Sequence, residues 1–358
     1  MTRIHHLPVS PIQEGINVLR LWGGRVVGQT WSRPISINLL ITSRCNSKCV
    51  TCDSWKLDDH ESELTTDDYR RLAKETADLG IPIVTIGGGE PVLRQDLWEI
   101  IRAFKEAGRV VQLTTNGLTM RADQRRKMFE SGLDRVTVSV DSHIPEIYAK
   151  IRGVDALSGV KENLLALLRE RPPNLEVDTN TVLCSDNAET FLDTIDALIS
   201  WGVPKTNFSA VTTAGENYLM VDNKRALSVC PRTLISQIVV GLRERKRRTR
   251  VISASSAFIH GLVPYFEHPD ELVYPCLAGY LTLDVFQNGA VHGCGNLPAF
   301  GNVRNGSLTE IWKSRDAQTN RENMAAGRCP NCYLSCKAEL AIAANPKCLL
   351  RFAIEKLG

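Results

Sequence analysis

The sequence lacks any apolar run of the ~18 residues that a membrane-spanning helix needs. Its first residues, MTRIHHLPVSPIQEG, have neither the apolar core nor the small-residue cleavage site of a secretory signal. An excess of one charge is also absent, because the net charge is only +3. These absences predict a cytoplasmic protein that binds neither a membrane nor nucleic acid.

The chain has eleven cysteines, but their pattern lacks the features of a disulfide framework. The number is odd, and most of them form two groups, one at positions 45, 49 and 52 and the other at 276, 294, 329, 332 and 336. Cytoplasmic thiols stay reduced. The grouping therefore predicts metal ligation instead of disulfides.

The first cysteine group has no fourth thiol. Cys45, Cys49 and Cys52 share one short loop, whereas a structural zinc site closes four ligands around the metal, usually as two separated pairs. Three thiolates in one loop suit a [4Fe–4S] cube in which one iron has no protein ligand. That iron can bind the amino and carboxylate groups of a small molecule.

From about residue 35 the chain alternates strand-like and helix-like patterns. Apolar runs such as ISINLLIT (35–42) and IPIVTI (81–86) are each followed by a helical pattern, and six such units fill roughly residues 35–211. Alternation of this kind implies parallel βαβ units, and a closed eight-unit barrel needs about 250 residues. The sequence therefore predicts an α/β fold with a partial, open (β/α)6 barrel, whose chemistry lies on loops after the strands.

The pattern changes beyond the sixth strand. Residues 222–262 look helical and contain a charged run, Arg243–Arg250, which we interpret as a solvated helix face. After Tyr274 the segment LTLDVFQNGAVHGC alternates around Asn288-Gly289, which is a hairpin signal. We expect four parts: an extension (1–34), the barrel (35–215), a helical bridge (216–270) and a small domain (271–358) with a β-hairpin and a cysteine-rich end.

The C-x3-C-x2-C spacing after a first barrel strand resembles the signature of radical S-adenosylmethionine (SAM) enzymes. The resemblance implies that Cys45, Cys49 and Cys52 hold a [4Fe–4S] cluster bound to SAM. Motifs that end the following strands are similar to family positions that contact the SAM amino group, ribose and carboxylate, namely Gly88, Gly89, Glu90, Thr115, Asn116, Ser139, Asp141 and Arg152. Outside that family, GGGEP is a tight strand-to-helix turn and Arg152 a surface-helix residue.

One position departs from the family pattern. The residue before the third cysteine is usually aromatic and covers the adenine, but here it is Thr51. Trp55 is the alternative stacking residue. The family chemistry that the resemblance implies is reductive cleavage of SAM to a 5′-deoxyadenosyl radical, which abstracts hydrogen from a C–H bond. An electron donor such as flavodoxin or ferredoxin supplies the electron.

The second cysteine group resembles the SPASM/Twitch domains that carry auxiliary iron–sulfur clusters. Cys276, twelve residues, Gly289, four residues and Cys294 match the opening of that module. The later run is one cysteine short of the full SPASM pattern, which favours one auxiliary [4Fe–4S] cluster. Its ligands are four of Cys276, Cys294, Cys329, Cys332 and Cys336, with spacing favouring Cys329 and Cys332 and with Cys348 a further candidate; a zinc knuckle is the alternative.

The substrate is expected to be small, such as a sugar, an aminocyclitol or another natural-product intermediate. Peptide maturases often begin with a leader-recognition domain, and only 34 residues precede the first expected strand. A peptide maturase and a non-enzymatic iron–sulfur carrier stay open as alternatives, although a carrier has no need of the SAM motifs. Glu216 and Asn217, after the sixth strand, are candidates for binding substrate hydroxyls or amines.

Two outcomes of the radical chemistry need different residues. A dehydrogenase passes the substrate electron to the auxiliary cluster, which we favour, whereas an epimerase returns hydrogen from a thiol. Cys184 ends the fifth strand and is the candidate hydrogen donor, with buried packing as the alternative. We expect packing for Cys230 and structural hydrogen bonds for His143 and His292.

Overall fold

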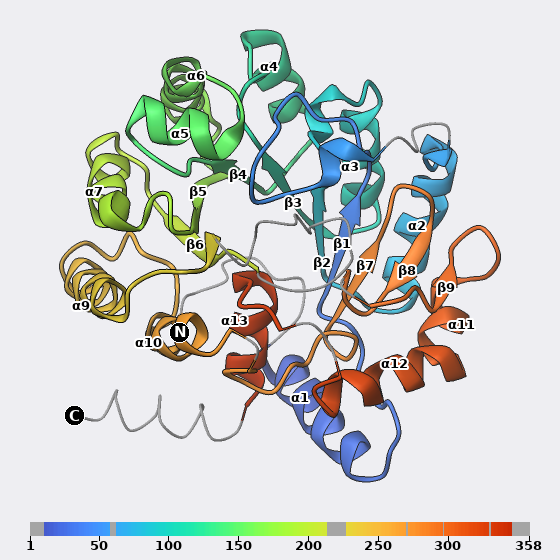
Figure 1. Ribbon diagram of the computed structural model, residues 1–358. Coiled ribbons are helices and arrows are strands. Elements are labelled where there is room, and N and C mark those ends of the chain that lie inside the picture. Colours follow the sequence, from blue (N-terminus) through green and yellow to red (C-terminus); the bar gives the residue numbers. More distant parts are fainter. Residues whose placement is uncertain are drawn as a thin grey trace.

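The computed structural model describes residues 11–57, 62–212, 227–269, 271–295, 297–328 and 331–345. Its sheet begins with six strands, each parallel to its neighbour (Figure 1). They are β1 (Ser36–Leu40), β2 (Ile83–Gly87), β3 (Val110–Thr115), β4 (Arg135–Ser139), β5 (Glu176–Leu183) and β6 (Thr206–Ala210).

Helices lie around the outside of these strands in Figure 1. They begin and end as α2 (Thr66–Asp78), α3 (Leu97–Glu106), α4 (Ala122–Glu130), α5 (Pro145–Arg152), α6 (Leu157–Glu170), α7 (Phe191–Ser200), α9 (Arg232–Thr249) and α10 (Ser256–Glu267). Short 3-10 turns are η1 (Ser54–Lys56), η3 (Pro91–Leu93) and η4 (Ala188–Thr190). None of the helices in the described part of the chain is long and apolar enough to span a membrane.

Burial alternates along the strands and separates two faces. Val84, Ile86 and Leu113 point outward and are fully buried in one core with helix residues such as Phe104. Burying each such side chain stabilises the fold by about 1.5–3 kcal/mol. Intervening residues such as Thr114 are only half-buried, and Thr114 lines the pocket inside the barrel. The interior face is therefore left for the functional site.

The carboxyl-terminal part extends the same sheet. β7 (Thr282–Val285) pairs in parallel with β1, and β8 (Ala290–His292) and β9 (Gly301–Asn302) follow as antiparallel strands. The sheet order is β6-β5-β4-β3-β2-β1-β7-β8-β9. The predicted hairpin around Asn288-Gly289 is confirmed, and Gly289 has the positive φ of 86° that such a turn uses. The predicted fold class, a partial barrel followed by a cysteine-bearing region with antiparallel strands, is also confirmed.

Four more helices complete the described fold: α1 (Pro11–Val26), α11 (Leu308–Lys313), α12 (Arg315–Ala325) and α13 (Ser335–Ala344). Figure 1 shows α13 between β6 and β7, on the open side of the barrel. The Ser335 hydroxyl lies 2.9 Å from that of Ser209 in β6, and Lys337 Nζ donates to Asp284 in β7 at 2.7 Å. Helix α13 therefore bridges the two strands that border the opening.

Candidate active site

A pocket of about 220 Å³ opens at the carboxyl ends of the barrel strands. It is lined by most of the residues that the sequence singled out, from five different loops: Cys45, Cys49, Cys52, Gly88, Gly89, Thr115, Asn116, Ser139 and Arg152. Thr51 and Trp55 line it too, so either side chain is placed to face a bound adenine. The structure thus brings the three thiols and the candidate SAM contacts to one place.

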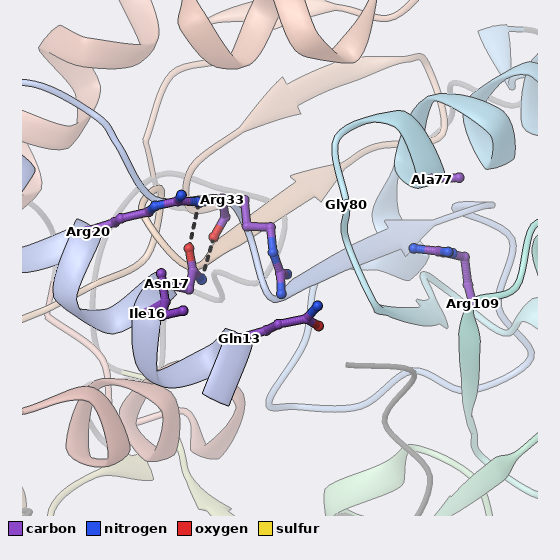
Figure 2. A pocket seen from close by; sticks show the side chains of 8 residues that line it. All are labelled: Gln13, Ile16, Asn17, Arg20, Arg33, Ala77, Gly80 and Arg109. Atoms are coloured by element: carbon purple, nitrogen blue, oxygen red, sulfur yellow. Dashed lines mark hydrogen bonds between the residues drawn. The ribbon is translucent and has the colours of Figure 1, made fainter. Parts of the chain in front are cut away.

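A second pocket, of about 440 Å³, lies at the opposite ends of the strands (Figure 2). Arg33 precedes β1 and Arg109 precedes β3, and Asn17 of α1 exchanges hydrogen bonds with the backbone of Arg33. Arg109 donates to the carbonyls of Ala107 and Ile81, which fastens the start of β3. This pocket is larger but contains no thiol or carboxylate, so we place the reaction site at the smaller one.

The cysteine loop is fixed against the end of α5. The backbone N–H of Lys48 donates to the carbonyl of Arg152, and that of Val50 donates to Ile151, at 3.2 and 2.9 Å. Gly153 follows with a φ of 67°, and a Cβ there would overlap the Lys48 carbonyl. Only glycine therefore allows the loop to lie this close.

The second and third glycines of GGGEP, Gly88 and Gly89, have a similar role on the other side of the loop. Gly88 has a φ of 131°, and a Cβ on Gly89 would overlap the Arg44 carbonyl. The Gly89 N–H donates to Thr42 at 2.7 Å, and the Glu90 N–H donates to Arg44 at 2.7 Å. The motif is thus a turn that docks on the cysteine loop through its backbone.

Glu90 lies beneath the pocket, with 1% of its surface exposed. Its carboxylate accepts hydrogen bonds from the backbone of Val92 and Asn116 and from the Thr115 hydroxyl, at 2.7–3.1 Å. Burial raises the pKa of Glu90, and the bonds from Asn116, Thr115 and Val92 oppose that rise. Glu90 therefore orders the loop that presents Thr115 and Asn116.

Arg152 and Asp141 form a buried ion pair at the pocket, with Nη1 and Oδ2 3.2 Å apart. Asp141 also accepts the Val182 N–H at 2.8 Å. Burial would lower the pKa of Arg152, but Cys49 and Asp141 outweigh it and raise that pKa. The alternative of a surface arginine is wrong, because only 9% of Arg152 is exposed.

The Arg152 Nε has no hydrogen-bond partner among the described residues, although it is buried. A buried guanidinium donor without an acceptor is costly, and a ligand carboxylate in the pocket would satisfy it. Burial raises the pKa of Cys49 to about 11, so cluster binding must deprotonate this thiol. The thiols, the glycine turn and the free Nε therefore fit an iron–sulfur cluster with bound SAM.

Cys184 lies elsewhere. It is fully buried in an apolar cluster with Phe191 and Ile195, and it does not line the pocket. Burial raises the pKa of its thiol to about 12. Cys230 packs against the same cluster. Glu216 and Asn217 lie outside the described residues.

Both candidate histidines make structural hydrogen bonds. His143 Nδ1 lies 3.0 Å from the Thr194 hydroxyl, and His292 Nδ1 lies 2.8 Å from the Leu297 carbonyl.

The second cysteine group surrounds another cavity, which Cys276, Cys294 and Cys332 line together with Lys337. Burial raises the pKa of Cys332, and the nearby Cys294, Cys276 and Cys336 add to the rise. Cys336 is thus near Cys332 and is the fourth thiol of this group among the described residues. Cys329, which the spacing favoured, and Cys348 lie outside the described residues.

These thiols do not converge on a point. No group of three or more Cys, His, Asp or Glu side chains in the described part of the chain is arranged to hold a single metal ion. In a four-iron cube each thiolate binds a different iron, so its ligands are spread more widely. The donor set at both sites therefore suits cubes.

Sequence reasoning missed Lys337 and Asp284. Both side chains are buried beside the second thiol group, and their amino and carboxylate groups are 2.7 Å apart. The charge of Lys337, directly after Cys336, is the one signal in the sequence that could have found it.

Comparison with known families agrees with this geometry. The sequence model of the radical SAM superfamily matches residues 39–198, and that of the SPASM iron-sulfur cluster-binding domain matches residues 276–337. Curated relatives include a probable GTP 3′,8-cyclase of Methanothermobacter thermautotrophicus, 37% identical over 37% of this chain and 44% of that protein. Another, from Sulfurisphaera tokodaii, is 36% identical over 43% of this chain and 51% of that protein. The chain thus spans about half the length of these relatives.

Solved structures share the fold at low identity. Streptococcus suis SuiB bound to S-adenosylmethionine superposes with a TM-score of 0.65 and 16% identity, covering 85% of this chain and 70% of that one. The enzyme anSMEcpe with bound AdoMet gives 0.62 and 16%, covering 81% and 83%. Residues 39–198 match the radical SAM superfamily and residues 276–337 match the SPASM domain, so this chain combines a radical SAM barrel with a carboxyl-terminal SPASM iron–sulfur domain.

Proposed function

We propose that this protein is a radical SAM dehydrogenase that oxidises a C–H bond of a small natural-product, sugar or aminocyclitol-type substrate. The observation that carries the proposal is the position of the second thiol group. Cys336 lies in α13, which is hydrogen-bonded to both β6 and β7 at the barrel opening. An auxiliary cluster bound by Cys336 would lie at the opening of the barrel, next to the pocket, and could accept an electron from the substrate.

The first site supplies the radical. Cys45, Cys49 and Cys52 would hold a [4Fe–4S] cluster that, once reduced by a flavodoxin or ferredoxin, would supply the electron for SAM cleavage and so for removal of one hydrogen atom from the substrate. Arg152, positioned by Asp141, would bind the SAM carboxylate. Thr115, Asn116 and Ser139 would face the ribose, and the turn from Gly88 to Glu90 would receive the amino group. A single auxiliary cluster held by the second thiol group would accept the remaining electron and solvent the proton, so the product would be two hydrogens lighter than the substrate.

The burial of Cys184 supports dehydrogenation over epimerisation. A hydrogen donor must reach the substrate radical, but Cys184 is enclosed by apolar side chains and is absent from the pocket lining. A thiol in that position is accounted for by packing. Changing Cys184 to Ala should therefore leave product formation intact and cost only stability.

The names of related proteins do not define the substrate. The probable GTP 3′,8-cyclases match the barrel but only half of their own length, and the likeness to SuiB at 16% identity concerns the fold alone. The peptide-maturase alternative gains no support from it. An iron–sulfur carrier is less favoured because it has no use for the pocket around Arg152.

The test is an anaerobic assay with dithionite, SAM and a panel of aminocyclitols and sugars, run in deuterium oxide. The proposal expects a product two mass units lighter than its substrate, with 5′-deoxyadenosine formed in equal amount. A product in which one carbon-bound hydrogen is replaced by deuterium, one mass unit heavier than the substrate, would contradict it, because that is the mark of hydrogen return from a thiol. Failure of the Cys184→Ala variant to form product would point the same way.

A further inference from the structure

Three consecutive residues at the start of α13 join the open barrel to the second thiol group. Ser335 bonds to Ser209 of β6, and Lys337 donates to Thr282 and Asp284 of β7, at 2.9 and 2.7 Å. Cys336 stands between these two anchors. The position of this thiol is therefore set by contacts with both edges of the opening.

Asp284 ties together the segments that carry the other thiols. Its carboxylate accepts from Asn38 in β1 at 2.6 Å and from the backbone N–H of Gly295, directly after Cys294, at 2.9 Å. The side chains of Lys337 and Asp284 are each only 8% exposed. Replacing such a buried ion pair with apolar residues is often neutral or stabilising, so fold stability alone does not account for it.

The Lys337 ammonium has two hydrogen-bond acceptors among the described residues. It carries three N–H groups, of which Thr282 and Asp284 take two. Lys337 also lines the cavity of Cys276, Cys294 and Cys332. Lys337 therefore presents a cation to this cavity, held by its ion pair with Asp284.

We propose that Lys337 raises the reduction potential of the auxiliary cluster and so makes it an electron acceptor for the substrate radical. A cation beside a cluster stabilises the reduced form, which carries one more negative charge, and hydrogen bonds to cluster sulfurs act in the same direction. Lys337 acts through the cluster and does not touch the substrate. The inference rests on the proposed dehydrogenation, in which that cluster accepts the second electron.

The test is a redox titration that needs no substrate. The full chain with Cys45, Cys49 and Cys52 changed to Ala isolates the auxiliary cluster, whose midpoint potential is followed by electron paramagnetic resonance. In this background we compare Lys337→Met, which removes the cation, with Lys337→Arg, which keeps it. Asp284→Asn removes the negative partner of Lys337, so it should shift the midpoint potential in the opposite direction to Lys337→Met.

The expected result has a sign for each variant. Lys337→Met should lower the potential by at least 59 mV, which is tenfold in the one-electron equilibrium constant. Lys337→Arg should change the potential by less than half as much as Lys337→Met. Asp284→Asn should raise the potential. If the Lys337→Met variant does not bind iron, the sign of the potential shift in Asp284→Asn still tests the proposal. A higher potential supports it, and a lower one contradicts it.

Unchanged potentials, or shifts of the same sign in Lys337→Met and Asp284→Asn, would overturn the inference and leave the pair a structural tie. The proposed function is tested separately. The potential could shift as expected while the enzyme forms a product in which one hydrogen is replaced by deuterium. That pair of results would contradict the dehydrogenation and would still support the role of Lys337.

Discussion

At the scale of single residues, buried charged side chains mark positions that either bind a ligand or lower the stability of the fold. Arg152 has a charge partner in Asp141 yet leaves Nε without an acceptor. Asp178 of β5 is the opposite case, because its Oδ1 is buried without a hydrogen bond and Arg135 is 3.8 Å away. The first charge predicts a ligand acceptor in the pocket, and the second predicts a pH-dependent loss of stability.

Arg152→Met should weaken SAM binding by at least tenfold, because a charge-assisted hydrogen bond is worth about 1.5–3 kcal/mol. Isothermal titration of the iron-loaded protein with SAM measures this. Arg125→Met is the matched control, since Arg125 is also buried but pairs with Glu170 on the outer layer. Equal SAM affinity in both variants and the unchanged protein would remove Arg152 from the site.

Asp178→Asn should stabilise the fold above pH 6. Burial raises the pKa of Asp178 to about 6. Between its unfolded pKa of about 4 and 6 the folded state holds a proton that the unfolded state has lost, so stability falls as pH rises through this window. Asparagine avoids the ionised form, and the gain should be about 1–3 kcal/mol at pH 7 and vanish near pH 4.

Chemical denaturation across that pH range checks the prediction, with Glu176→Gln as control. Arg135 holds the pKa of Glu176 below its usual value against the effect of burial. Its ionised form is therefore stabilising, and its loss should lower stability at pH 7. A gain from Asp178→Asn that is equal at pH 4 and pH 7 would show that ionisation is not the cause.

At the scale of elements, local signals located the cysteine loop, the glycine turn and the hairpin, because each depends on spacing within a few residues. Contacts between residues that are far apart in the chain leave no such local pattern in the sequence. Lys337 and Asp284 are 53 residues apart in the chain and meet because α13 lies against β7. The same holds for Cys336, whose place is set by Ser209 of β6.

Gly153→Ala should dislodge the cysteine loop and reduce the iron bound at the first site. The residue has a positive φ, and its Cβ would overlap the Lys48 carbonyl, so the loop must move away from α5. Gly159→Ala in α6 is the control, because nothing lies within 4 Å of its Cβ. That change should keep the iron and stabilise the helix by up to about 1 kcal/mol; equal iron in both variants would exclude a role for the close approach.

At the scale of the whole molecule, one continuous sheet holds both thiol groups. The parallel pairing of β1 with β7 places the strand before the first cysteine loop beside the strand that follows Cys276. Six parallel units and the cysteine-rich end were predictable from the sequence, because periodicity reports secondary structure directly. The joint sheet and the bridging α13 were not, because neither depends on a local pattern.

The measurement that tests the account most directly is the iron content of the anaerobically reconstituted protein together with its cleavage of SAM. We predict about eight irons per chain, as two four-iron clusters, and 5′-deoxyadenosine formation with dithionite. Changing Cys45, Cys49 and Cys52 together to Ala should leave about four irons and abolish 5′-deoxyadenosine. Unchanged iron in that variant, or SAM cleavage that survives it, would contradict the assignment of the two sites.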